Sequence, residues 1–231
     1  MANGIMKTIV GKLVILGDGG VGKTSLITRY TQKAFNLNIS STIGASFFTC
    51  KTNIDNAIVR LQIWDTAGQE RFKAMTPMFY RNANAALLVF DITCLDSFGN
   101  MQTWAQQLKG NVVEPMVLCV IGNKIDLSEN RVVSREEALQ YANSIGAQYF
   151  ECSAKEDQGI GQVFETISRD LIRLSSDSSV KSLKVYEGDV ESALMARSTD
   201  LEATDVGRIE EPGISIDSIA HAKTVPSKCC Y

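Results

Sequence analysis

A glycine-rich loop near the N-terminus has the residue types and the spacing that hold phosphate groups. Residues 17–24, GDGGVGKT, run as a glycine, four residues and then Gly-Lys-Thr, between an apolar run and a helical pattern. Glycine lets the backbone curl so that its N–H groups and the N-terminus of the following helix face negative charge. The alternative is a glycine-rich turn without a ligand. We expect Lys23 to contact the outer phosphates and Thr24 to bind Mg²⁺. The residues of this loop predicted to bind the nucleotide are Asp18, Gly19, Gly20, Val21, Gly22, Lys23, Thr24 and Ser25.

A second polar cluster, Asp65-Thr66-Ala67-Gly68-Gln69, follows the apolar run 59–64. A carboxylate that emerges from a buried strand can hold Mg²⁺ through water, and the N–H of Gly68 can follow the terminal phosphate. The amide of Gln69 can orient an attacking water, which makes it the candidate catalytic residue. Alone, Asp65 is more typical of a turn or a helix cap.

A third cluster selects the base of the nucleotide. Asn123-Lys124-Ile125-Asp126 follows the apolar run 116–121, and Ser153-Ala154-Lys155 follows the run 148–152. The carboxylate of Asp126 can accept from N1–H and from the exocyclic amine of guanine, whereas adenine has no such donor pair on that edge. A buried acceptor left unpaired costs about 1–3 kcal/mol. Each cluster alone is commonly a solvated loop, but their order along the chain favours a guanine nucleotide.

Short apolar runs that alternate with helical patterns must position these loops. The runs are 13–16, 59–64, 85–90, 116–121 and 148–152. Such alternation is typical of a parallel sheet wrapped by helices, in which ligands bind at the carboxyl ends of the strands. Ser134 and Glu137 have capping-box spacing at the start of a helix over 134–145, and residues 159–174 have an apolar face of period 3.6. We predict a six-stranded, mostly parallel α/β sheet flanked by helices.

Composition excludes several classes of function. The formal charge is −3, so no broad basic surface is available and nucleic acid is not an expected partner. No apolar run approaches the roughly 18 residues of a membrane-spanning helix. The only histidine, His221, is near the C-terminus in a polar stretch, which excludes catalysis by a histidine base in the core. Cys50, Cys94, Cys119 and Cys152 lack the spacing of a zinc site or a disulfide framework, so we expect reduced packing residues.

The pattern of the folded domain ends at Leu174. Residues 175–231 hold no helical or strand period for long and contain ten acidic and six basic residues. We therefore predict a short extension over 1–7, a domain over 8–174 and a disordered tail over 175–231.

With these motifs in order, residues 8–174 resemble a small GTPase of the Ras superfamily, and within it a Rab. The Rab-like stretches are Ile43–Phe47, Leu61–Trp64, Arg71–Thr76 and Leu88–Thr93, and Ser41–Phe47 most resembles the endosomal branch. Phe79–Ala83, FYRNA, departs from the usual Tyr-Tyr-Arg-Gly-Ala, and Ile39 stands where a tyrosine is frequent. These departures affect the expected effector identity, not the nucleotide chemistry.

The resemblance implies the phosphate-loop small GTPase fold and a switch that binds GTP or GDP with Mg²⁺ and hydrolyses GTP. It implies that Thr42 senses the γ-phosphate and Mg²⁺, that Phe35 packs against guanine, and that 68–80 form a second switch. Phe47, Trp64 and Phe79 match the family's aromatic effector triad, and ordinary core packing is the alternative for them. No arginine finger is identifiable, so unaided hydrolysis is expected at about one event per hour.

The chain ends Lys228-Cys229-Cys230-Tyr231, which is not a CaaX signal. It resembles the double-cysteine ends of Rabs, which carry two geranylgeranyl groups, and an acidic tail should need both lipid chains for stable anchoring. The alternative is a pair of free thiols. The resemblance further implies an exchange factor, an activating protein, effectors and a prenyl-Rab carrier protein. We expect a monomer on the cytoplasmic face of endosomal membranes, with a carrier-bound cytosolic pool.

Two other functions remain open from the sequence. One is a metabolic phosphate-loop ATPase or kinase, against which Asp126 argues. The other is a soluble scaffold that binds nucleotide with little turnover, against which Gly19 and Gln69 argue.

Overall fold

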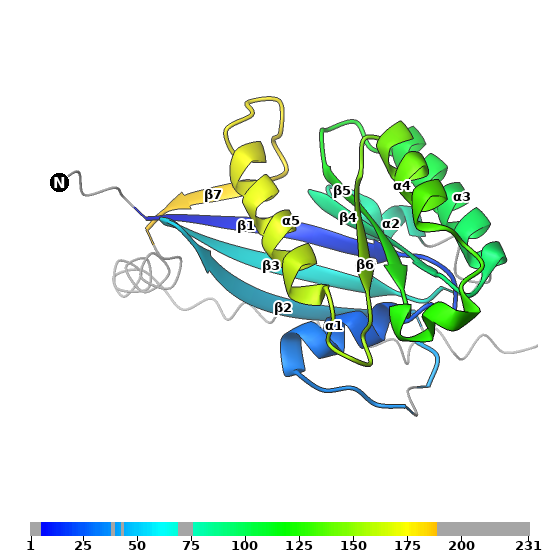
Figure 1. The fold of residues 1–231 in the computed structure, drawn as a ribbon. Helices are drawn as coiled ribbons and strands as arrows, with labels where there is room; N and C mark the ends of the chain where they lie inside the picture. Colours follow the sequence, from blue (N-terminus) through cyan, green and yellow to red (C-terminus); the bar gives the residue numbers. More distant parts are fainter. Residues whose placement is uncertain (1–5, 38–39, 43, 69–75, 189–231) are drawn as a thin grey trace, which may run out of the picture. The chain divides into compact units, whose positions relative to one another are not determined.

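Strands and helices alternate through the part of the chain that the computed structural model describes, which is residues 6–37, 40–42, 44–68 and 76–188 (Figure 1). This alternation is the one expected from the apolar runs. The elements are β1 (Lys7–Leu16), α1 (Lys23–Gln32), β2 (Ala45–Ile54), β3 (Ala57–Thr66), α2 (Thr76–Tyr80), β4 (Ala85–Asp91), α3 (Leu95–Asn111), β5 (Val117–Asn123), the 3₁₀ helix η2 (Ile125–Asn130), α4 (Arg135–Ser144), β6 (Gln148–Cys152), α5 (Ile160–Leu174) and β7 (Lys184–Glu187).

The sheet has the strand order β2-β3-β1-β4-β5-β6. From β3 to β6 neighbouring strands are parallel, and only β2 in this path is antiparallel, paired with β3 from Ala45↔Thr66 to Ile54↔Ala57. The predicted mostly parallel α/β fold is therefore confirmed. Because β1, β3, β4, β5 and β6 run the same way, the loops after them meet at one edge of the sheet.

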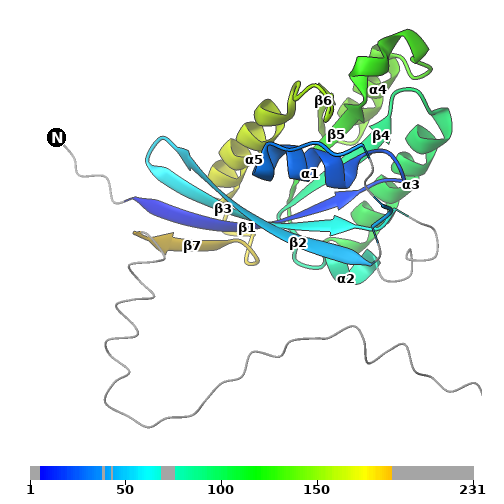
Figure 2. The ribbon, with the colours of Figure 1, turned by 90° about the horizontal axis from the view of Figure 1, so that it is seen from below.

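Both faces of the sheet are buried, which explains why its central strands are apolar throughout. On β1, Leu13 and Ile15 belong to the core under α1 and α5, whereas Val14 and Leu16 belong to the core under α3 and α4. Figure 2 shows helices on both faces of the sheet. The alternation of side chains along a strand thus gives a three-layer arrangement.

Two helices begin where the sequence predicts. At α4 the hydroxyl of Ser134 accepts a hydrogen bond from the backbone N–H of Glu137 at 3.1 Å, as expected of a capping box. At α5 the buried residues recur with helical period, namely Ile160, Val163, Phe164, Ile167, Ser168 and Leu171. Gly159 precedes this helix with a φ of 76°, in the left-handed region.

A seventh strand corrects the predicted six and lies in the segment expected to be tail. β7 pairs antiparallel with the start of β1, from Lys7↔Glu187 to Val10↔Lys184. Leu183 is buried, and the hydroxyl of the fully buried Thr8 donates to the carbonyl of Gly188 at 2.7 Å. The sequence does not reveal this strand because all four residues of β7 are exposed, so neither face shows an apolar pattern.

The four cysteines of the domain divide into two groups. Cys119 and Cys152 are buried, and Cys50 is partly buried against the same core, as predicted. Cys94 is exposed at the N-cap of α3, so the packing prediction is wrong for it. Among the described residues, no helix has the length and apolarity needed to cross a membrane.

Candidate nucleotide-binding site

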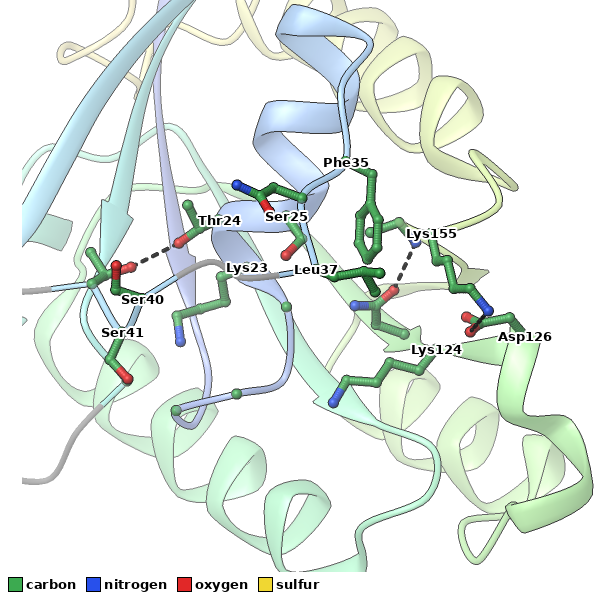
Figure 3. Close-up of a pocket in the computed structure, with 18 residues that line it drawn as sticks. Lys23, Thr24, Ser25, Phe35, Leu37, Ser40, Ser41, Lys124, Asp126 and Lys155 are labelled. Carbon is green, nitrogen blue, oxygen red and sulfur yellow. Dashed lines mark hydrogen bonds and ion pairs between the residues drawn. The ribbon is translucent and has the colours of Figure 1, made fainter.

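A cavity of about 320 Å³ opens at the carboxyl ends of the strands and gathers the three predicted motifs (Figure 3). Figure 3 shows Lys23 and Thr24 at one end, and Phe35, Lys124, Asp126 and Lys155 around the other. The lining residues are Gly19, Gly20, Gly22, Lys23, Thr24, Ser25, Phe35, Asn36, Leu37, Ser40, Ser41, Thr42, Gly68, Asn123, Lys124, Asp126, Ala154 and Lys155.

The end of the cavity at Lys23 is built by the turn from β1 into α1. Gly22 is the N-cap of α1 with a φ of 96°, and a Cβ at this position would lie 2.4 Å from Nδ2 of Asn123. No side chain caps α1, and its first turn holds no acidic residue. The N–H groups at this helix end therefore remain available to an anion, which the helix dipole also favours.

Lys23 points into the phosphate loop. Its ammonium donates to the carbonyls of Gly17 and Asp18, at 2.7 Å each. Burial lowers the pKa of Lys23 to about 8, against the opposing effects of Asp65 and Asp18. A buried cation held only by neutral carbonyls and nearby carboxylates is well placed to receive phosphate.

The three predicted metal ligands converge beside Lys23. The hydroxyl of Thr24 donates to Oδ2 of Asp65 at 2.5 Å and lies 2.8 Å from the hydroxyl of Thr42. Burial raises the pKa of Asp65, and hydrogen bonding by Thr24 and the charge of Lys23 act in the opposite direction. Within the described residues, Oδ1 of Asp65 is buried without a hydrogen-bond partner. A carboxylate oxygen without a partner next to two hydroxyls fits Mg²⁺, which prefers oxygen ligands and keeps sites for phosphate and water.

Gly68 lies against the phosphate loop. A Cβ at this position would lie 2.2 Å from the carbonyl carbon of Asp18, so only glycine allows this approach. Gly68 thus lines the cavity at the same end as Lys23. Gln69, the predicted catalytic residue, lies outside the described residues, and its role stays a prediction.

Asn123 joins the two ends of the site. Its Nδ2 donates to the carbonyl of Val21 at 2.8 Å, and its Oδ1 accepts from the N–H of Ala154 at 3.4 Å. Val21 and Ser153 do not line the cavity, although both were predicted to bind nucleotide. They act behind it, because Val21 accepts from Asn123 and the buried hydroxyl of Ser153 donates to Asp126 at 2.6 Å.

The other end of the cavity carries Asp126 and two side chains, Phe35 and Lys124, that can sandwich a planar base. Figure 3 shows Phe35 and Lys124 on opposite sides of this region, with Asp126 and Lys155 at its end. Lys155 Nζ lies 3.9 Å from Oδ2 of Asp126. Recognition of guanine by its N1–H and amine edge at Asp126 stays a prediction.

Several residues of the site were missed by the sequence analysis. Asp91 pairs with Lys124 at 2.6 Å, and Asn100 donates to the carboxylate of Asp18 at 2.6 Å. Asp18, also predicted to bind nucleotide, is not among the lining residues of the cavity. Asp91 ends an apolar strand as Asp65 does, and this signal could have revealed it. Asn36, Leu37 and Ser40 follow Phe35 outside any motif, and Ser41 belongs to a Rab-like stretch but was not predicted to line the site.

Comparison with known proteins decides the family. Residues 12–173 match the Ras family. Rab-21 of Homo sapiens is 47% identical over 161 residues, which are 70% of this chain and 72% of that protein. Rab-21 of Bos taurus is 46% identical over 166 residues, 72% and 75% of the two chains, and Rab-31 of Rattus norvegicus is 47% identical over 160 residues, 69% and 82%.

The chain is a Rab small GTPase of the Ras family. The predicted resemblance to the endosomal Rab branch is confirmed, and so are GTP hydrolysis, GTP or GDP with Mg²⁺ as ligands, and a role in vesicle traffic. Membership of the family also implies exchange factors, activating proteins and effectors as partners. The scaffold without turnover and the metabolic ATPase or kinase are not favoured.

In this Rab the predicted effector triad forms one aromatic cluster across β2, β3 and α2. Phe47 and Trp64 are paired in the β2–β3 ladder with ring centroids 5.4 Å apart, and Trp64 and Phe79 are 6.0 Å apart. Phe47 is 52% exposed, whereas Phe79 packs against the core. The cluster therefore combines a surface with core packing.

One departure from the Rab pattern has a structural explanation. Asn82 replaces the usual glycine of the Tyr-Tyr-Arg-Gly-Ala stretch and has a φ of 56°. Asparagine tolerates this left-handed conformation better than other residues with a Cβ, so the turn before β4 is kept. Ile39, the second departure, lies outside the described residues.

Proposed function

We propose that this Rab binds GTP in the cavity of Figure 3 through the residues assigned to it, and hydrolyses it with a water oriented by Gln69. The observation that carries the proposal is that one cavity is lined by Lys23, Thr24 and Thr42 at one end and by Asp126 at the other. Asp65 lies directly behind the first end, where it accepts from the hydroxyl of Thr24.

Each residue has a role that follows from its position. Lys23 and the free N–H groups at the start of α1 bind the phosphates, and the close approach of Gly68 lets its N–H follow the outermost one. Thr24, Thr42 and Asp65 would hold Mg²⁺, which when bound neutralises charge on the β and γ phosphates. Asp126 accepts from guanine, while Phe35 and Lys124 cover the two faces of the base.

The hydrolysis cycle makes the protein a switch. Thr42 and Gly68 line the end of the cavity where the terminal phosphate would bind. Loss of that phosphate would remove the contacts that order the segment around Thr42 and the segment that begins at Gly68. We propose that effectors bind the cluster of Phe47, Trp64 and Phe79 and detect this difference there. The cluster is partly exposed and spans β2, β3 and α2, and Thr42 precedes β2 while Gly68 follows β3.

We further propose that Cys229 and Cys230, which lie outside the described residues, carry two geranylgeranyl groups and that a prenyl-Rab carrier protein shields them in the cytosol. The adjacent pair of cysteines supports this proposal, as does the acidic tail, which offers no basic patch as a second anchor. Mass spectrometry of the C-terminal peptide from native cells tests it. An unmodified peptide in the membrane fraction would contradict it.

The catalytic assignment is tested by single-turnover hydrolysis with an activating protein present. Gln69→Leu should keep nucleotide affinity and lose most of the stimulated rate, by about 10³-fold or more, because no other amide was identified to orient the water. Gln140→Leu on the exposed face of α4 is the matched control and should hydrolyse as wild type does. A wild-type rate in Gln69→Leu would mean that another group positions the water.

A further inference from the structure

Arg29 on α1 binds the loop of residues 153–155, beside the end of the cavity proposed to hold the guanine base. Its Nε donates to the carbonyl of Ala154 and its Nη2 to the carbonyl of Lys155, at 2.8 Å each. The two carbonyls belong to consecutive peptides, so two N–H groups of one planar guanidinium bind them at the same time. Such bidentate hydrogen bonding is typical of arginine. Arg29 belongs to none of the motifs that predict the site.

The same side chain also fixes the segment that leads to Phe35. Nη1 of Arg29 donates to the carbonyl of Lys33 at 3.3 Å, and Lys33 is the left-handed C-cap of α1. The guanidinium carbon lies 5.7 Å from the centroid of the Phe35 ring. Arg29 therefore connects Phe35, on one side of the base region, with the loop 153–155 at its end.

A continuous chain of hydrogen bonds runs from Arg29 to Asp126. A trans peptide is planar with its C=O and N–H opposed, so the bond from Arg29 to the carbonyl of Lys155 orients the N–H of Glu156 to the other side. That N–H donates to the hydroxyl of Ser153 at 3.0 Å, and the hydroxyl in turn donates to Oδ1 of Asp126 at 2.6 Å. Because the oxygen of Ser153 accepts from the N–H of Glu156, its own hydrogen is directed toward Asp126.

We propose that Arg29 is a positioning residue for guanine selection, which acts through the Lys155–Glu156 peptide and Ser153 on the carboxylate of Asp126. The inference rests on the proposed guanine pocket and extends it to a residue that lines no part of the cavity. Lysine cannot replace arginine here, because a single ammonium does not present two donors in a fixed plane to two successive carbonyls.

The test compares GDP with inosine diphosphate, which lacks the exocyclic amine that Asp126 accepts from. Affinities of both nucleotides are measured on the same sample with Mg²⁺ by competition against a fluorescent GDP probe. Their ratio does not depend on the folded fraction of a variant. Arg29→Lys should lower the affinity for GDP about tenfold and the affinity for inosine diphosphate by a smaller factor. The ratio of the two affinities should therefore fall about threefold.

Controls separate positioning from a general loss of structure. Arg173→Lys removes a guanidinium contact with Asp170 on α5 and should keep the wild-type ratio. Ser153→Ala should lower the ratio as Arg29→Lys does, and the double variant should lower it no further, because both break the same chain. Arg29→Met, which keeps an apolar stem for packing, should behave as Arg29→Lys does.

The outcomes are distinct. If wild type does not prefer GDP over inosine diphosphate, the proposed guanine pocket is wrong. If wild type does and Arg29→Lys weakens both nucleotides by the same factor, Arg29 has only a structural role and this inference is overturned.

Discussion

The hydroxyl of Thr24 lies between two oxygen groups, 2.5 Å from the carboxylate of Asp65 and 2.8 Å from the hydroxyl of Thr42. These residues come from α1, from the end of β3 and from the segment before β2, so the site closes only when all three segments are in place. An ion bound here would couple them.

Replacement of Thr24 by asparagine should therefore lower the affinity for GTP more than the affinity for GDP. The lost hydroxyl is a ligand of the ion that bridges the β and γ phosphates, and GDP depends less on it. Titrations of both nucleotides with and without Mg²⁺ measure the effect. Thr31→Asn, further along α1 with its hydroxyl bonded to the carbonyl of Ile27, is the control. Equal losses for GTP and GDP in Thr24→Asn would remove this residue from the metal site.

Asp126→Asn should exchange guanine for xanthine. Xanthine has a carbonyl where guanine has its amine, so an amide donor replaces the carboxylate acceptor. The affinity for GTP should fall about 10- to 100-fold, and xanthosine triphosphate should bind better than GTP. Competition between the two triphosphates is the measurement, with Asp170→Asn on α5 as control. A retained preference for GTP would refute the assigned role of Asp126.

The ion pair of Asp91 and Lys124 should stabilise the fold at neutral pH. Burial alone would raise the pKa of Asp91, but hydrogen bonds from Lys124 and Thr93 outweigh it, and the pKa lies below its ordinary value. A carboxyl with a lowered folded-state pKa stabilises above the unfolded pKa near 4, and this stabilisation is lost as the pH falls through the folded pKa.

Asp91→Asn should thus lower the free energy of unfolding by about 1 kcal/mol at pH 7 and by progressively less below pH about 4. Urea unfolding of both proteins across this range gives the difference directly, and the other carboxyl groups cancel from it. A difference independent of pH would show that the charge of Asp91 does not act in this way.

The cysteines should differ in their reaction with iodoacetamide at pH 8. Burial raises the pKa of Cys119 and of Cys152 to about 12, and the thiolate is the reactive form. Cys94, exposed at the start of α3, should alkylate in the native protein, and Cys119 and Cys152 only after unfolding. Peptide mapping distinguishes each site, including those of the tail. Native labelling of Cys119 as fast as that of Cys94 would contradict the buried position.

Asn82 should be replaceable by glycine but not by valine. Its φ of 56° is open to glycine, whereas a β-branched residue should destabilise the fold by about 1–2 kcal/mol. Thermal unfolding of Asn82→Gly and Asn82→Val, with Asn143→Val on α4 as control, measures the effect. An unchanged Asn82→Val would mean that the turn has another conformation open to it.

The central strands of the sheet were predictable because they are buried on both faces, which makes them continuous apolar runs. The edge strand β2 alternates partly buried with exposed residues and matches none of the predicted runs. β7 could not be predicted because it has no buried face and is stabilised by the ladder to β1 and by single contacts of Leu183 and Thr8. The helices over 134–145 and 159–174 were predictable from local signals, a cap and a period.

The site was predictable where one residue type is tied to one task at a fixed spacing, as for Lys23, Thr24 and Asp126. Arg29 and Asn100 act on residues far along the chain, Ala154 and Asp18, and no local spacing reports such a contact. Ser153 belongs to a motif, but its hydrogen bond to Asp126 joins two separate loops and is not apparent from local spacing.

The pairing of β7 with the first residues of β1 fixes how the domain is tethered. The chain departs from Gly188, beside Met6 and Thr8, while the phosphate loop follows the other end of β1 at Leu16. If the proposed lipids anchor the chain, tension would act on the β1–β7 ladder before it acts on the nucleotide site. Peeling β7 away would lengthen the tether by the fourteen residues after Leu174, up to about 50 Å of extended chain, without disturbing the five parallel strands that hold the nucleotide.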